Sequence, residues 1–199
     1  MSESRSTDYF AIFSLPRKLW IETSELEQKF LQMSWKWHPD NFVNASQAER
    51  ESSLRCSSEL NDAYRTLKEP VARVEYLLAI EGARKEGEQK QQVPPELLEE
   101  VFELNESLDE LREARAEDGD LAVLKQRLAA AQENFRQKLE EVDGELFKAA
   151  KGWDATVDVE ASGSNAQAER EAIKQRLNEL LNRRAYIRNL VNNVQKELL

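Results

Sequence analysis

The chain has 199 residues, of which a third are charged and only six are glycine, and its formal net charge is −10. This charge argues against nucleic acid as the main partner, because a phosphate backbone attracts basic surfaces. One cysteine, Cys56, and one histidine, His38, exclude an internal disulfide and cannot supply the four ligands of a structural zinc site or an iron–sulfur cluster. We therefore expect no metal or cofactor. The sequence also shows no nucleophile–base pair and no phosphate-binding loop, so we do not expect an enzyme.

The pattern of apolar residues indicates an all-α protein. Apolar side chains recur in steps of three and four, and no convincing strand alternation is present. No apolar run is long enough to span a bilayer, and the polar segment 1–9 lacks the apolar core of a signal peptide. We therefore expect a cytoplasmic protein with no membrane partner.

The first long helix is predicted to start at a cap formed by Thr23 or Ser24 and to stop at His38, because Pro39 disfavours helical geometry in the residue before it. An apolar stripe along this helix consists of Leu26, Phe30, Met33 and Trp37. A polar stripe on another face contains Glu25, Lys29, Gln32 and Lys36.

Residues 40–46 are predicted to form a loop, and a second long helix is predicted from about Gln47 to Lys68. Two long helices joined by a short loop pack antiparallel. His38, Pro39 and Asp40 should therefore lie at the tip of a helical hairpin. A shorter helix is predicted over 71–80, after Pro70.

The second half of the chain predicts a three-helix bundle. Residues 82–92 contain two glycines and no large apolar residue, so we expect a linker between a first domain, 1–81, and a second domain, 93–199. The three apolar stripes of the bundle contain Leu97, Val101, Leu104, Leu108 and Leu111; Leu121, Leu124, Leu128, Phe135, Leu139, Val142 and Leu146; and Ile173, Leu177, Leu180, Ile187, Val191, Val194 and Leu198. Residues 152–165 are predicted to be a loop whose Trp153 tucks into the end of the bundle.

Several segments around the tripeptide match a known family. Asp8-Tyr9-Phe10 opens the chain, Trp35-Lys36-Trp37 precedes His38-Pro39-Asp40, and the segment 61–67 reads Asn-Asp-Ala-Tyr-Arg-Thr-Leu. Over roughly its first seventy residues the chain resembles the J-domain family. The resemblance implies docking on the nucleotide-binding domain of a DnaK-type chaperone and stimulation of its ATP hydrolysis, with no bond chemistry by the J-domain itself.

The resemblance assigns His38, Pro39 and Asp40 to the essential triplet of that family. Pro39 fixes the turn, and Asp40 offers an acceptor to a basic partner group. His38 bonds the partner or fixes the loop; the alternative is a structural histidine at a helix end. The family also implies a chaperone-binding basic face, here Lys29 and Lys36, for which a merely solvated face is the alternative.

Asn41 stands where the family often has a basic residue. We therefore expect weaker electrostatic steering than in strongly basic J-domains.

The second half is similar to the HscB-type co-chaperones of iron–sulfur cluster assembly. The similarity lies in the segments 73–78, Arg-Val-Glu-Tyr-Leu-Leu, and 97–110, and it implies an IscU-type scaffold as client and an HscA-type member of the DnaK class as chaperone. The scaffold-binding residues that it implies are Leu98, Phe102, Glu103, Glu106, Glu110 and Tyr186. Glu99 departs from the pattern, because the family places an apolar residue there.

The helix geometry points to the same face independently. Leu98 and Phe102 are one turn apart but lie about 100° around the helix from the core stripe. Glutamates flank them, and apolar anchors rimmed by acids suit a partner surface. The alternative is that Leu98 and Phe102 widen an ordinary core stripe.

The sequence thus predicts a non-enzymatic co-chaperone that stimulates a DnaK/HscA-type ATPase and delivers an IscU-type scaffold. Two other hypotheses stay open at this point. A J-domain protein for a different client would depend on His38 but would not bind the scaffold. A helical adaptor with a chance His-Pro-Asp would stimulate no chaperone.

Overall fold

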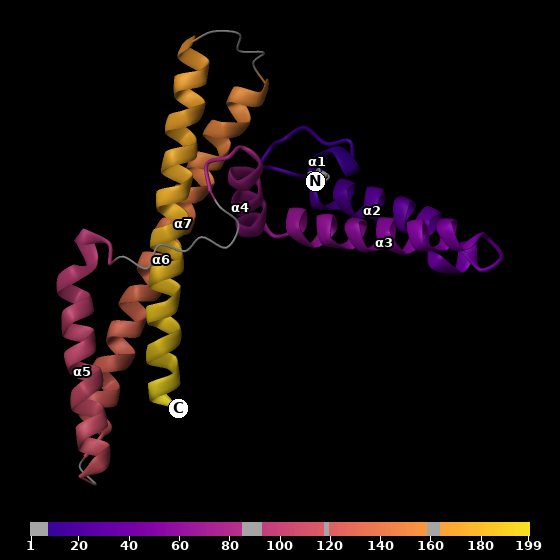
Figure 1. Ribbon diagram of the computed structural model, residues 1–199. Helices are drawn as coiled ribbons and strands as arrows, with labels where there is room; N and C mark the ends of the chain where they lie inside the picture. The colour runs from indigo at the N-terminus through magenta and orange to yellow at the C-terminus, as the bar shows by residue number, and fades with distance from the viewer. Residues whose placement is uncertain (1–7, 85–92, 118–119, 159–163) are drawn as a thin grey trace, which may run out of the picture. The chain divides into compact units, whose positions relative to one another are not determined.

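The computed structural model describes residues 8–84, 93–117, 120–158 and 164–199. All regular structure in these segments is helical (Figure 1), which confirms the all-α prediction. The chain forms two compact units, one of Met1–Glu86 with Ala149–Gln175 and one of Gly87–Lys148 with Arg176–Leu199. This division differs from the predicted one, which kept residues 93–199 together. Most of the predicted linker, 85–92, lies outside the described residues. No helix within the described segments has both the length and the apolar content needed to cross a bilayer.

A helical hairpin dominates the first unit. The elements of this unit are α1 (Tyr9–Ile12), α2 (Thr23–Trp37), the 3-10 helix η1 (Pro39–Phe42), α3 (Gln47–Lys68) and α4 (Pro70–Ile80). The unit also includes the end of α6 (Ala122–Asp158) and the start of α7 (Ser164–Leu198). Helices α2 and α3 lie antiparallel, and the loop that joins them forms the free end of the hairpin (Figure 1). The predicted end of α2 and both predicted ends of α3 are confirmed.

The predicted cap of α2 is wrong. Thr23 is already the first helical residue, and the N-cap is Glu22, whose side chain makes no capping hydrogen bond. Ser24 instead donates its hydroxyl to the Glu22 carboxylate at 3.2 Å. By contrast, α3 begins with a full capping box: Ser46 accepts from the Glu49 amide, and the Glu49 carboxylate accepts from the Ser46 amide. This reciprocal pair satisfies two backbone donors and fixes the point where the loop ends.

The two long helices are held together by the predicted apolar stripes. Leu26 of α2 is fully buried, and the ring of Phe30 stacks on Tyr64 of α3 at a centroid distance of 4.1 Å. Leu60 and Leu67 complete the buried side of α3. These contacts make the hairpin a rigid support for its loop, because closely packed side chains leave little room for relative movement.

Arg73 of α4 is a buried cation at the base of the hairpin. Its guanidinium donates to the carbonyl of Leu19 at 2.6 Å, to that of Leu67 at 2.6 Å and to that of Lys68 at 3.3 Å. Two of these acceptors are carbonyls at the end of α3 that have no partner within the helix. Desolvation lowers the pKa of Arg73, whereas the charges of Asp154 and Glu69 raise it. The guanidinium thus joins the segment before α2 to the end of α3.

The predicted loop at 152–165 is wrong over most of its length. Helix α6 continues through Asp158 and α7 begins at Ser164, so only 159–163 lie outside the described residues. Trp153 is 3% exposed, and its indole donates to the carbonyl of Arg17 at 2.8 Å. It therefore packs in the first unit instead of tucking into the end of a bundle. Gly152 weakens a helix, but burial of the neighbouring indole outweighs a propensity cost of about 1 kcal/mol.

Asp154 strengthens the same contact. Its carboxylate accepts from the backbone amides of Leu19 at 2.6 Å and Trp20 at 2.8 Å. Burial raises the pKa of Asp154, and the two amide donors oppose that shift. Lys18 forms a further ion pair with Asp158. The end of α6 therefore holds the segment that leads into α2.

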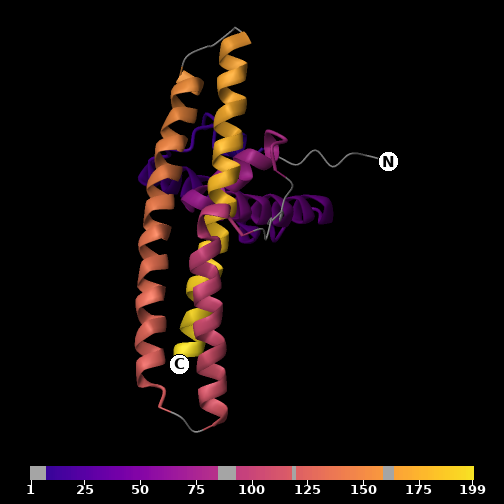
Figure 2. The ribbon, with the colours of Figure 1, turned by 90° about the vertical axis from the view of Figure 1, so that its left-hand side faces the viewer.

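The second unit is a bundle of α5 (Leu98–Ala116) with parts of α6 and α7, and the 3-10 helix η2 (Pro95–Leu97) precedes α5. The three helices run side by side (Figures 1 and 2). Ion pairs set their register: Glu100 with Lys138 and Glu110 with Arg127 place α5 antiparallel to α6. Arg112 of α5 pairs with Glu197 at 2.8 Å, near the end of α7.

We predict that Trp153→Ala destabilises the chain by about 3–5 kcal/mol, because it removes a buried indole and leaves the Arg17 carbonyl without its donor. The matched control is Trp35→Ala, since Trp35 is 77% exposed and should change the unfolding free energy by less than about 0.5 kcal/mol. Denaturant unfolding of the full chain measures both. Equal unfolding free energies for the two variants would contradict the packing of Trp153.

Candidate functional site

The His38-Pro39-Asp40 loop lies at the tip of the hairpin and is open to solvent. Pro39 occupies the first turn of η1, and His38 closes α2 with φ −63° and ψ 129°. The Nδ1 atom of His38 accepts from the Asp40 amide at 3.3 Å, so a neutral imidazole carries its proton on Nε2, where it can donate to a partner. One carboxylate oxygen of Asp40 lies 3.6 Å from Nδ1 of His38, and the side chain is 85% exposed, so the carboxylate remains accessible to a basic group of a partner.

Residues that the sequence analysis missed hold this loop in place. Buried Ser53 of α3 donates its hydroxyl to the carbonyl of Trp37 at 2.9 Å, and Asn41 donates its amide to the carbonyl of Trp35 at 2.6 Å. Both bonds satisfy carbonyls at the end of α2. The rings of Trp37 and Phe42 stack across the turn with their planes 5° apart. Ser53 lies nearly two turns into α3, at offsets of three and seven from Cys56 and Leu60 of the apolar stripe. This position was the available signal, since a serine on a buried face needs a hydrogen-bond partner.

The predicted basic face is only partly available. Lys29 forms an ion pair with Glu25 at 2.9 Å. Lys36 is exposed, with its ammonium 5.5 Å from the centre of the Trp37 ring. One of the two predicted lysines is therefore neutralised by a neighbour, and the other remains open to a partner.

The predicted apolar pair on α5 points away from the core. Leu98 is 56% and Phe102 71% exposed, whereas their neighbours Leu97 and Val101 are 1% and 7% exposed. The alternative that the pair widens the core stripe is thus wrong. Glu103 and Glu106 are exposed on the same helix, as is Glu99.

The remaining two residues of the predicted scaffold face are less open. Glu110 is half-buried and pairs with Arg127 at 2.8 Å, so part of its charge is already balanced. Tyr186 is half-buried on α7, and burial raises the pKa of its phenol. It lies one turn from Arg183, whose guanidinium is 3.4 Å from the carboxylate of Glu96 just before α5. Tyr186 is therefore on the side of α7 that faces the start of α5.

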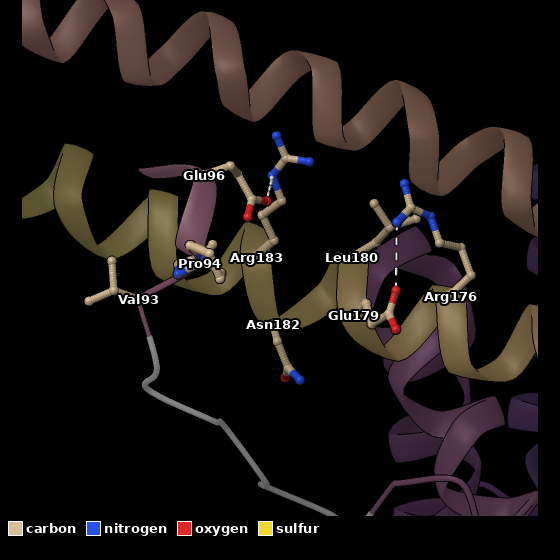
Figure 3. Close-up of a pocket in the computed structure, with 9 residues that line it drawn as sticks. Val93, Pro94, Glu96, Arg176, Glu179, Leu180, Asn182 and Arg183 are labelled. Carbon is tan, nitrogen blue, oxygen red and sulfur yellow. Dashed lines mark ion pairs between the residues drawn. The ribbon is translucent and has the colours of Figure 1, made fainter. Parts of the chain in front are cut away.

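A pocket of about 360 Å³ lies beside this region, between the start of η2 and α7 (Figure 3). Its charged lining residues are Glu96, Arg176, Glu179 and Arg183. All four side chains form ion pairs, and Figure 3 shows two of these pairs, Glu96 with Arg183 and Glu179 with Arg176. The pocket thus offers little unbalanced charge with which to select a ligand. Within the described part of the chain, no group of three or more His, Cys, Asp or Glu side chains is arranged to hold a metal ion.

Known proteins resemble the chain along most of its length, although no protein-family model matches it. Co-chaperone HscB homologues from Vibrio parahaemolyticus and Vibrio cholerae are 33% and 32% identical over 139 and 133 residues, which cover 70% and 67% of this chain and 80% and 78% of the relatives. The chain belongs to the HscB family of J-domain co-chaperones.

Solved structures of HscB proteins have the same fold. Chaperone HscB from Vibrio cholerae matches with 26% identity and a TM-score of 0.55 over 96% of both chains. Human co-chaperone protein HscB matches with 21% identity and a TM-score of 0.63 over 99% of this chain and 85% of the human one. The all-α architecture is therefore that of HscB proteins.

We predict that Leu98→Ala with Phe102→Ala leaves the unfolding free energy of the free HscB family member within about 0.5 kcal/mol of wild type. Both side chains are exposed, so truncation creates no cavity. The matched pair Leu97→Ala with Leu104→Ala removes buried side chains and should cost about 2–5 kcal/mol per site. Chemical denaturation followed by circular dichroism compares the two pairs. A large loss in the first pair would place it in the core.

Proposed function

We propose that this HscB family member stimulates ATP hydrolysis by a DnaK/HscA-type chaperone through the His38–Asp40 loop and delivers an IscU-type iron–sulfur scaffold bound to α5. The observation that carries the proposal is the exposure of the triplet at the end of a rigid hairpin, together with the co-chaperone names of the relatives. The proposed role is not enzymatic. The expected cytoplasmic location stays a prediction.

The geometry of the loop suits a partner that presents cationic and acceptor groups together. The exposed Asp40 carboxylate offers a strong acceptor to an arginine or lysine of the chaperone. The Nδ1 atom of His38 already accepts from the Asp40 amide, so Nε2–H, two residues before Asp40, is the group that can donate to the partner. Pro39 fixes the backbone between them, so little conformational entropy is lost when the chaperone binds.

The exposed face of α5 suits the client. Leu98 and Phe102 provide apolar area that the bundle leaves open, and Glu103 and Glu106 border it. Such an arrangement gives affinity at the apolar centre and steers a basic partner through the acids. A scaffold with an apolar patch and a basic rim is the complementary surface. A co-chaperone with both the His38–Asp40 loop and the α5 face would hold the client next to the chaperone at the moment when ATP hydrolysis closes the chaperone on the client.

We predict that His38→Gln abolishes stimulation of the chaperone while the helix content stays unchanged. Glutamine keeps a polar side chain at the helix end but cannot reproduce the two nitrogens of the imidazole. Steady-state ATP hydrolysis by an HscA-type chaperone, with and without each variant, measures the effect. The control is Asn44→Ala in the same loop, an exposed position that should stimulate like wild type. Full stimulation by His38→Gln would contradict the proposal that the chaperone is stimulated through the His38–Asp40 loop.

We predict that Leu98→Ala with Phe102→Ala weakens scaffold binding by about thirtyfold, since truncation of a hot spot costs at least about 2 kcal/mol. Calorimetric titration with a purified IscU-type scaffold measures the affinity. The acids give a second arm: Glu103→Lys with Glu106→Lys should slow association, and added salt should shrink the difference.

The control for the acids is Glu140→Lys with Glu141→Lys, which makes the same change in net charge at exposed positions of α6. If this control slows association equally, total charge and not the α5 face attracts the scaffold. Normal binding by the alanine pair, with stimulation of the chaperone intact, would point to a different client.

A further inference from the structure

An exposed apolar pair on α2 leads directly to the triplet. Leu31 is 50% exposed and Trp35 77% exposed, and neither belongs to the buried stripe of the helix. Leu31, Trp35 and His38 follow one another at offsets of four and three, so the three side chains form one stripe along the outer face of α2. Large exposed aromatic residues of this kind are enriched among the residues that dominate binding energy in interfaces.

The backbone at the end of α2 keeps His38 on this stripe. His38 retains a helical φ of −63°, and only its ψ of 129° turns the chain out of the helix. Its side chain therefore continues the direction set by the helix. Asn41 donates to the carbonyl of Trp35, which ties the loop after the triplet to the same turn as the exposed indole. With a rise of about 1.5 Å per residue, Trp35 precedes His38 by only about 4.5 Å along the axis.

The predicted basic residues lie elsewhere on the helix. Lys29 and Lys36 are roughly 140–160° around the axis from Leu31. Lys29 is paired with Glu25, and the residue after the triplet is the uncharged Asn41. A partner that contacts His38 along the helix therefore meets an apolar surface, with little positive charge to attract it.

We propose that Leu31 and Trp35 form an apolar anchor for the same chaperone ATPase whose hydrolysis the triplet stimulates, and that this anchor supplies more of the affinity than the lysines do. The inference rests on the proposed function, because it extends the same docking surface. The occupant follows from continuity: a chaperone surface that covers His38 must also cover the indole one turn before it. The anchor sets affinity, whereas His38 sets the response of the ATPase.

The test is a titration of an HscA-type chaperone with each variant, in which ATP hydrolysis gives both the half-stimulating concentration and the maximal stimulation. Trp35→Ala should raise the half-stimulating concentration by about thirtyfold and reach the wild-type maximum at saturation. Leu31→Ala should raise it by a smaller factor. The matched control is Leu54→Ala, since Leu54 is 57% exposed on α3 and should behave like wild type.

The salt dependence separates the anchor from the charges. The effect of Trp35→Ala should persist at high salt, whereas the smaller effect of Lys36→Ala should shrink because salt screens exposed charges. His38→Gln should instead lose the maximal stimulation at every concentration.

Three results would overturn the inference. An unchanged half-stimulating concentration for Trp35→Ala, with His38→Gln inactive, removes the anchor and leaves the proposed function in place. A dimer in sedimentation that Trp35→Ala dissociates assigns the stripe to a second copy of the chain. A wild-type protein that does not stimulate the chaperone overturns both the inference and the proposed function.

Discussion

The buried guanidinium of Arg73 fixes the base from which the functional loop is displayed. It bonds the carbonyl of Leu19, just before α2, and two carbonyls at the end of α3. From that base α2 extends for 15 residues, or about 22 Å, to the triplet. Over such a length, a rotation of about 5° at the base would move the tip by about 2 Å. The three hydrogen bonds also satisfy carbonyls that would otherwise be buried without a partner, so no apolar residue could replace Arg73 without loss.

A second set of contacts supports the same segment from the other side. Trp153 and Asp154 of α6 bind the backbone of Arg17, Leu19 and Trp20, which are more than a hundred residues earlier in the chain. The negative charge of Asp154 also favours the charged form of Arg73. The hairpin is thus not an independent module in this chain, because residues of α6 complete its base. The side chains of both candidate binding faces contribute little to the core, because Leu98, Phe102, Leu31 and Trp35 are all exposed.

Much of the hairpin could be predicted because its determinants are local. Pro39 ends α2 through a steric clash with the residue before it, and the stripe of Leu26 and Phe30 identifies the buried side of the same helix. The exposure of Leu98 and Phe102 follows equally from helix geometry. The segment 152–165 was predicted wrongly because Gly152 and the polar residues after Trp153 have low helix propensity, whereas packing of the indole decides the conformation. The N-cap of α2 was also predicted wrongly, because Glu22, Thr23 and Ser24 are consecutive polar residues and each could begin the helix.

By itself, the sequence determined the helical class, the ends of the hairpin helices and the placement of His38, Pro39 and Asp40 in the loop between them, because each depends on residues within a few positions of one another. Only the tertiary structure decided that Arg73 is buried, that Trp153 belongs to the first unit and that Lys29 is neutralised while Trp35 is open. The first two depend on contacts between residues 54 and 136 positions apart. The last two depend on side-chain directions and exposure. Helical periodicity cannot reveal such contacts, because it states which residues share a face but not what that face meets.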